Sequence, residues 1–158
     1  MSVRHHTQKG FSMIELLIAL LVLAVGLFGM ASLMMTSMKS NQSASMRSQA
    51  SWLAYDIIER MRLNSDTATQ TSSYLIAAAD DAPADPNCKA GGCSNVNVAT
   101  LDLREWKTQL AQANLTGAVT RAAANAYTIS IFWQEDSSTA CAPVNGVPQC
   151  SFTLRADL

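Results

Sequence analysis

The feature that most constrains this chain is an uncharged apolar stretch close to its N-terminus. No Asp, Glu, Lys or Arg occurs from Leu16 to Met38, and no proline interrupts the stretch. At a rise of 1.5 Å per residue such a helix is about 35 Å long, which is enough to cross the hydrocarbon core of a bilayer. The sequence therefore predicts one membrane-spanning helix in front of a polar domain.

The charges around this stretch predict its orientation. Arg4 and Lys9 precede it and should stay on the cytoplasmic side, although Lys39 and Arg47 follow it and weaken the asymmetry. From Lys39 onward there are 9 basic and 11 acidic residues, a net charge of −2. That balance fits an ordinary soluble domain and gives no basic excess for binding nucleic acid. At 158 residues, the chain has room for roughly one such domain.

The helix is expected to continue beyond the span. Between Lys39 and Arg62 there is neither Gly nor Pro, and apolar residues recur with helical spacing. The expected organisation is a leader (1–10), a transmembrane and assembly helix (11–38), an amphipathic continuation (39–63) and a head (64–158). The apolar stripe of the continuation consists of Met46, Ala50, Leu53, Ala54, Ile57, Ile58 and Met61.

The head has the pattern of a small α+β fold. Residues 64–100 are rich in turn formers, and a short helix is expected from Asp102 to about Leu115, capped by Thr100 or Asp102. Apolar residues then alternate from Tyr127 to Trp133, which predicts a half-buried strand. Residues 118–121 and 151–158 are its candidate antiparallel partners, with Phe152 and Leu154 on one face of the last strand.

Other conspicuous residues have ordinary structural explanations. The acidic residues of the 80–85 loop lack the spacing of a calcium loop and are expected to be solvated, as are His5 and His6 in the leader. No catalytic or cofactor-binding motif is recognisable, so neither an enzymatic activity nor a cofactor is expected. Packing, rather than ligand stacking, is expected of Trp52, Tyr55, Trp106 and Trp133.

The cysteines form two close pairs beyond the span. Cys88 and Cys93 enclose a flexible four-residue spacer, and Cys141 and Cys150 flank a loop that contains Pro and Gly. An even number of cysteines beyond a membrane segment is typical of disulfides in an oxidising compartment. Four cysteines allow three connectivities, of which the two local pairs are favoured. Zinc is the rival interpretation, but neither pair has CxxC spacing and both histidines lie in the leader, so no metal is expected.

The segment that most indicates function is Lys9-Gly10-Phe11-Ser12-Met13-Ile14-Glu15, between the basic leader and the apolar run. It resembles the cleavage site of type IV prepilins, which carry class III signal peptides. The resemblance implies cleavage after Gly10 and N-methylation of the new N-terminal residue, Phe11. It also implies that Glu15 serves assembly, by pairing with the freed Phe11 amine of a neighbouring subunit.

The similarity extends along residues 41–62. This stretch, the paired cysteines, the DLREW segment and the terminal strand resemble minor pilins of the PilV type. The resemblance implies a low-abundance subunit that aids pilus initiation, and so twitching motility or adhesion. Its implied partners are other major and minor pilins, the prepilin peptidase and the inner-membrane assembly platform. The implied location is the inner membrane with a periplasmic head, followed by the pilus at the cell surface.

One departure from the pattern of major pilins bears on this assignment. Major type IV pilins usually have a proline within the apolar segment, and this chain has none. Gly26 and Gly29 could soften the helix instead, or they could allow close packing of neighbouring helices. The missing proline favours a minor pilin or a pseudopilin over a major pilin.

Three other functions remain as alternatives. A minor pseudopilin of a type II secretion system would share the processing motif and the assembly helix. A competence-type minor pilin for DNA uptake would need a basic patch on the head, against which its net charge of −2 argues. The third alternative is an enzyme tethered by an uncleaved span, but that function would not explain the presence of the cleavage motif.

Overall fold

The computed structural model describes residues 10–88, 91–135, 141–144 and 147–158. Leader residues 1–9, with His5 and His6, and the Lys89-Ala90 spacer lie outside the described residues. Two compact units divide the chain, residues 1–41 and residues 42–158. The second unit holds most of the secondary structure and is called the head below, so the term now also covers residues 42–63 of the long helix.

Helix α1 (Met13–Leu63) is a single helix of 51 residues. This confirms that the apolar run and the amphipathic continuation form one helix, which ends just before Asn64. Within the head it buries a stripe along one side, because the apolar residues recur every three or four positions. The buried residues are Ala50, Leu53, Ala54, Ile57, Ile58 and Met61.

A four-stranded antiparallel sheet forms one wall of the head. Its strands are β1 (Thr116–Arg121), β2 (Ala126–Gln134), β3 (Ala142–Val144) and β4 (Val147–Asp157), in the order β1-β2-β4-β3. Register is defined by pairs such as Val119 with Ile129 and Ile129 with Leu154. The predicted α+β class and the three predicted strand regions are confirmed, whereas β3 was not predicted because three residues carry no periodic signal.

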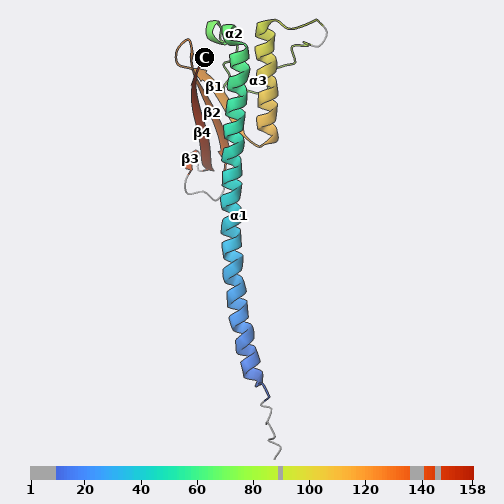
Figure 1. Cartoon of the computed structure of the whole chain (residues 1–158), viewed down its shortest axis with the longest axis vertical. Coiled ribbons are helices and arrows are strands. Elements are labelled where there is room, and N and C mark those ends of the chain that lie inside the picture. The colour runs from blue at the N-terminus through green and yellow to red at the C-terminus, as the bar shows by residue number, and fades with distance from the viewer. Residues whose placement is uncertain (1–9, 89–90, 136–140, 145–146) are drawn as a thin grey trace, which may run out of the picture. The chain divides into compact units, whose positions relative to one another are not determined.

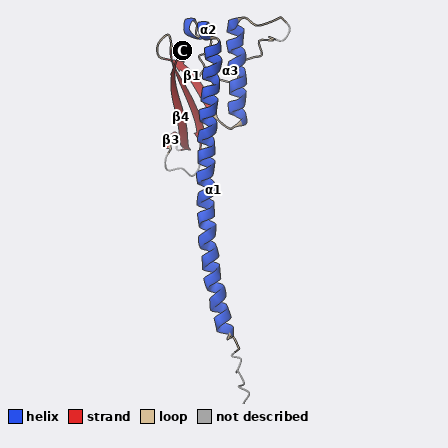
Figure 2. Cartoon of the chain, viewed as in Figure 1, coloured by secondary structure: helices blue, strands red, loops and turns tan. Residues whose placement is uncertain are grey.

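The core lies where the head portion of α1, helix α3 (Asn95–Gln112) and the sheet meet (Figures 1 and 2). The inward side chains of β2 are buried as the alternation predicted, namely Tyr127, Ile129, Ile131 and Trp133. Trp106 of α3 is fully buried, and its indole Nε1 donates a hydrogen bond of 2.9 Å to the carbonyl oxygen of Leu53. This contact connects α3 directly to α1.

The predicted start of α3, Asp102, was wrong by about two turns. The helix begins at Asn95, and its N-cap is Ser94, whose hydroxyl accepts a hydrogen bond of 3.2 Å from the Asn97 amide. Thr100 and Asp102 are not caps. The local sequence from Asn95 to Val98 has low helix propensity, so the cap and the burial of Ala99 in the core determine the start.

Helix α2 (Ser65–Gln70) lies in a region that was predicted to be loop. Six residues are too few for a periodic pattern. Contacts with distant parts of the chain hold its C-terminal end: the Arg121 guanidinium donates to the carbonyl oxygens of Ala68, Thr69 and Thr71. Tertiary contacts therefore supply what the local sequence does not.

Two of the four aromatic residues expected to pack do not. Trp106 and Trp133 are buried, but Trp52 is 62% exposed and Tyr55 is 54% exposed. Both lie on the side of α1 that faces away from the core stripe. The prediction was wrong for these two because a helix buries only the face that its neighbours cover.

Gly117 of β1 allows α3 to approach the sheet closely. A Cβ atom at this position would lie 2.7 Å from Trp106 Cη2 and 2.8 Å from Leu110 Cδ1. Both side chains are fully enclosed by the core and cannot move aside easily. We expect Gly117→Ala to reduce the free energy of unfolding by about 1–3 kcal/mol, the usual cost of overpacking.

Urea unfolding of the detergent-solubilised protein would measure this loss. Gly91→Ala is the matched control, because a Cβ there meets nothing within 4 Å. Equal unfolding midpoints for the two variants would contradict the close approach of α3.

Candidate processing and assembly site

The segment before α1 is exposed and non-helical. Gly10, Phe11 and Ser12 have no regular secondary structure, and Gly10 has open space where a side chain would be. The Ser12 carbonyl oxygen accepts hydrogen bonds from the amides of Glu15, at 3.0 Å, and Leu16, at 3.3 Å. The helix thus starts at Met13, two residues beyond the Gly10–Phe11 peptide bond, and a protease can reach that bond without unwinding the helix.

Glu15 lies in the first turn of α1. A carboxylate is favoured there, because the unpaired amides at a helix N-terminus carry partial positive charge. Among the described residues it forms no ion pair, and its side chain is exposed. Its carboxylate is therefore available to a cation supplied from outside the chain.

The apolar half of α1 has no cover within the chain. Every large apolar side chain from Phe11 to Met38 keeps more than half of its surface exposed. Among the described residues, α1 is the one helix long and apolar enough to cross a membrane, and none of its most apolar window is buried. A surface of this kind requires lipid or other helices around it.

Arg60 joins α1 to α3 in the head. Its guanidinium lies 2.9 Å from Asp56, 3.3 Å from Asp102 and 2.6 Å from Glu105, measured between the nearest nitrogen and oxygen atoms. Asp102 also accepts a hydrogen bond of 2.6 Å from the Tyr74 hydroxyl. Tyr74 is fully buried, and burial followed by this hydrogen bond raises the pKa of its phenol above the ordinary value.

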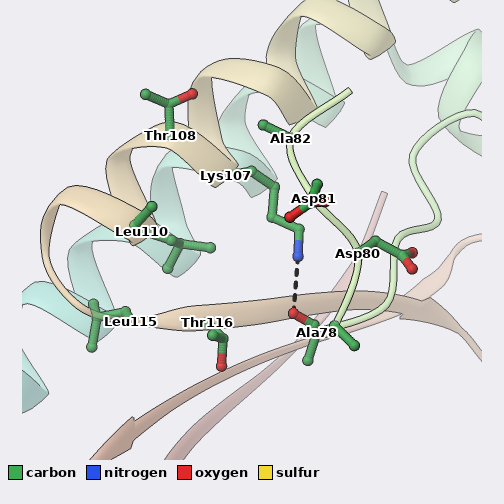
Figure 3. Close-up of a pocket in the computed structure, with 11 residues that line it drawn as sticks. Ala78, Asp80, Asp81, Ala82, Lys107, Thr108, Leu110, Leu115 and Thr116 are labelled. Carbon is green, nitrogen blue, oxygen red and sulfur yellow. Dashed lines mark hydrogen bonds between the residues drawn. The ribbon is translucent and has the colours of Figure 1, made fainter. Parts of the chain in front are cut away.

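A pocket of about 480 Å³ lies beside Lys107 (Figure 3). The ammonium of Lys107 donates hydrogen bonds to the carbonyl oxygens of Ala77, Ala78 and Gly117, at 2.8, 3.2 and 3.1 Å. Burial lowers the pKa of Lys107, while the nearby charges of Asp80 and Asp81 act in the opposite direction. Since all three N–H groups have backbone partners, Lys107 secures the 77–81 loop rather than serving a ligand.

The structure joins Cys88 to Cys93 and Cys141 to Cys150, with Cα–Cα distances of 5.0 and 4.7 Å. The second disulfide closes a loop between the edge of the sheet and β4. Next to it lies Glu135, whose Oε2 accepts hydrogen bonds from Ser43 Oγ, at 3.3 Å, and Trp133 Nε1, at 3.4 Å. This carboxylate connects the disulfide-bearing end of the sheet to α1.

The predicted site residues thus fall into two groups. Gly10, Phe11 and Glu15 lie together at the start of α1, whereas the cysteines belong to the head. Sequence reasoning missed Arg60, Tyr74 and Lys107 as structural connections. Their partners lie 28 to 45 residues away in several cases, so no local signal could have revealed them.

Two family models match the chain. One is described as the prokaryotic N-terminal methylation motif and matches residues 5–31, which include Gly10, Phe11 and Glu15. The other is described as type IV pilin Tt1218 and matches residues 32–104. Together they run without a gap from the leader into α3. No curated protein and no solved structure matches the chain.

Tyr74 should make the head sensitive to alkali. Its phenol has a raised pKa, so the folded state keeps this proton more tightly than the unfolded chain, whose tyrosines titrate near 10.0. The stability that Tyr74 contributes is therefore fully present below about pH 10 and is lost as the pH rises above it. We expect the free energy of unfolding to fall more steeply above about pH 10 in the wild type than in Tyr74→Phe.

Urea unfolding of the detergent-solubilised protein at several alkaline pH values would test this. The lowered pKa of Lys107 acts in the opposite direction but is common to both proteins, so it cancels in the comparison. Tyr55→Phe, which removes an exposed hydroxyl, is the control and should keep the wild-type slope. Identical slopes for wild type and Tyr74→Phe would refute the role of this buried phenol.

The two disulfides can be checked directly. Without reductant, we expect no alkylation of any cysteine. Trypsin has a site at Lys89 but none between Cys141 and Cys150, so tryptic mapping should yield a linked pair of peptides for Cys88–Cys93 and an intact loop for Cys141–Cys150. Opening the second loop by Cys141→Ser should cost about 3 kcal/mol or less, because the closed loop is short. A peptide that links Cys88 or Cys93 to Cys141 or Cys150 would overturn this pairing.

Proposed function

We propose that this type IV pilin is a minor structural subunit of a type IV pilus, in which it aids initiation and assembly of the fibre. The observation that carries the proposal is the placement of Gly10, Phe11 and Glu15 at the start of a helix whose apolar surface is exposed on all sides. The chain itself has no catalytic part in this proposal. It is the substrate of a prepilin peptidase.

Processing leaves the apolar helix in the mature subunit. Cleavage after Gly10 lies ahead of the apolar run, unlike cleavage of a secretory signal, which removes the apolar core. The mature chain then begins at Phe11, whose amine becomes N-methylated. Before assembly, α1 would hold the subunit in the inner membrane with the head in the periplasm, and afterwards the same helix would lie inside the fibre.

Glu15 gives the assembly step a physical basis. A carboxylate within an apolar helix costs about 2–3 kcal/mol at the bilayer centre and less toward the surface. The N-terminal amine of Phe11 in a neighbouring subunit would offset this cost, because opposite charges attract strongly where water is excluded. Pairing of the two groups would also fix the relative position of adjacent helices.

The proposals that the subunit is a minor one and that it belongs to a pilus rest on finer features of the sequence. The apolar run has no proline between Leu16 and Met38, and the chain resembles PilV-type pilins beyond the span. Its partners would be other pilins, the prepilin peptidase and the inner-membrane assembly platform. Through initiation of the fibre, the subunit would support twitching motility or adhesion.

A minor pseudopilin of a type II secretion system is the second candidate, and the absence of that proline favours it equally. The two functions differ in what fails when the subunit is lost. Loss of surface pili with normal protein export supports the pilus role. Blocked export with normal pili supports the pseudopilin role.

The proposal is tested by intact-mass and N-terminal analysis of the protein from membranes and from sheared surface fibres. A mature chain that begins at N-methylated Phe11 in both fractions is the expected result. Mature protein confined to membranes would favour the pseudopilin. An intact leader in a strain with active peptidase would refute processing at Gly10.

Substitution of Glu15 should separate insertion from assembly. We expect Glu15→Ala to enter the membrane and be processed normally, but to be strongly depleted from sheared fibres, because the Phe11 amine of its neighbour loses its counter-charge. Quantitative immunoblots of membrane and fibre fractions would measure this. Glu59→Ala, which removes an exposed glutamate from the same helix, is the control. Normal incorporation of the Glu15 variant would rule out the assembly role.

A further inference from the structure

The sheet of the head ends in an edge that its own chain covers only in part. Strand β4 is 11 residues long, but β3, with 3 residues, pairs with its beginning alone, and this pairing ends at Gln149. Beyond Gln149, no described segment pairs with β4 on the side away from β2 (Figure 1). A long unpaired edge is a template for another strand, and proteins normally shorten or cover such edges.

The register shows which main-chain groups point toward this open edge. Both main-chain groups of Val119 in β1 bind Ile76, so Val119 faces away from β2. Because orientation alternates in antiparallel pairs, its partner Ile129 faces β4, and Leu154, the partner of Ile129, faces β2. The residues on either side of Leu154 therefore face outward. The outward N–H and C=O groups have no main-chain partner among the described residues and belong to Ser151, Thr153, Arg155 and Asp157.

The apolar face of the sheet also ends uncovered at β4. On β2, the inward side chains from Tyr127 to Trp133 are buried, whereas those of β4 beyond Cys150 are only partly buried. These partly buried side chains are Phe152, Leu154 and Ala156. A further strand with apolar side chains at every second position would cover them and extend the core.

The opposite face of β4 carries two charges that lack a counter-charge. Arg155 and Asp157 are exposed and form no ion pair among the described residues. Their neighbours on β2 are the uncharged Thr128 and Ala126. Opposite charges that face each other across two strands are favourable, and like charges are unfavourable. An incoming antiparallel strand is therefore favoured when it places an acidic residue opposite Arg155 and a basic residue opposite Asp157.

Strand β4 of a second copy has the same order of charges but does not fill this edge. Matching Arg155 of each copy with Asp157 of the other overlaps only the ends of the two strands, so Ser151 and Thr153 stay unpaired. Strand β4 also runs in the same direction as the head portion of α1 (Figure 1). Antiparallel pairing of two copies would point their α1 helices in opposite directions, which two subunits anchored in one membrane cannot adopt.

We propose that the open edge of β4 binds an extended segment of a different protein by strand addition. The segment runs antiparallel to β4, has apolar residues at alternate positions, and carries a basic residue opposite Asp157 followed by an acidic residue opposite Arg155. Main-chain hydrogen bonds supply affinity in this mode of binding, and the alternate side chains supply specificity. The inference goes beyond the proposed fibre function and depends on neither processing nor Glu15.

Hydrogen exchange of the full-length protein in detergent, resolved to single residues, tests the proposal with a peptide probe. The probe Lys-Val-Glu-Val-Thr-Val-Thr places its Lys opposite Asp157 and its Glu opposite Arg155. Without it, the amide of Thr153 should exchange fast and those of Phe152 and Leu154, which face β2, slowly. With it, the amides of Thr153 and Arg155 should become protected. Unchanged exchange of these two amides at saturating probe would overturn the proposal.

A second peptide tests the match of charges. Glu-Val-Lys-Val-Thr-Val-Thr has the same composition and net charge as the probe, so it is the matched control. It should bind about tenfold more weakly, because two attractive cross-strand pairs become two repulsive ones. In the double variant Arg155→Asp with Asp157→Arg, the preference should reverse. Fluorescence anisotropy of labelled peptides measures these affinities, and equal binding of both peptides to the wild type would refute the charge-matched strand.

Substitution of Thr153 tests the main-chain pairing. Its N–H has no partner within the sheet, so Thr153→Pro should keep a thermal midpoint near that of the wild type, since open edges accept proline. The same change should weaken binding of the probe about tenfold or more, because it removes a central donor. Thr153→Val keeps the N–H and should bind as the wild type does. Equal binding of the probe by the proline variant would exclude strand addition.

Self-association gives a different pattern of protection. If the amides of Thr153 and Arg155 became protected with rising protein concentration and without probe, the edge would pair with a second copy. That result would overturn the proposal of a different protein as the partner and would leave the fibre function untouched.

Discussion

An apolar helix surface that its own chain leaves uncovered is the constraint on which the rest of this protein depends. From Phe11 to Met38, the large side chains of α1 remain exposed. Such a surface is compatible with lipid or with a bundle of similar helices, and not with water. A single carboxylate, Glu15, interrupts the apolar surface at the start of the helix. A charge at this position is tolerated at the membrane interface and can also select a partner of opposite charge.

The same helix has a second task within the head. There the residues from Ala50 to Met61 bury one stripe against the sheet and α3. Trp106 anchors α3 to the backbone of α1, and Gly117 lets the helix approach β1 without a clash. The head therefore holds the last turns of α1 through packing, and the unburied side of those turns is left for other molecules.

Polar contacts inside the head hold its segments together. Arg60 and Tyr74 converge on Asp102, and Lys107 binds three carbonyl oxygens from the 77–78 turn and β1. Buried ionic groups of this kind need all their partners, because an unpaired one would be costly. This requirement explains why the pocket at Lys107 offers little to a ligand.

The sequence by itself determined the features that depend on local pattern. The uncharged run from Leu16 to Met38 is visible from its composition. Periodic spacing of apolar residues reveals the stripe from Ala50 to Met61 and the alternation from Tyr127 to Trp133. The Gly10-Phe11 junction with Glu15 is likewise readable without coordinates. Only the tertiary structure decided the start of α3 at Asn95, the short helix α2, the partners of Lys107 and the exposure of Trp52. These depend on which surfaces distant segments cover, and a segment's own sequence does not record its neighbours.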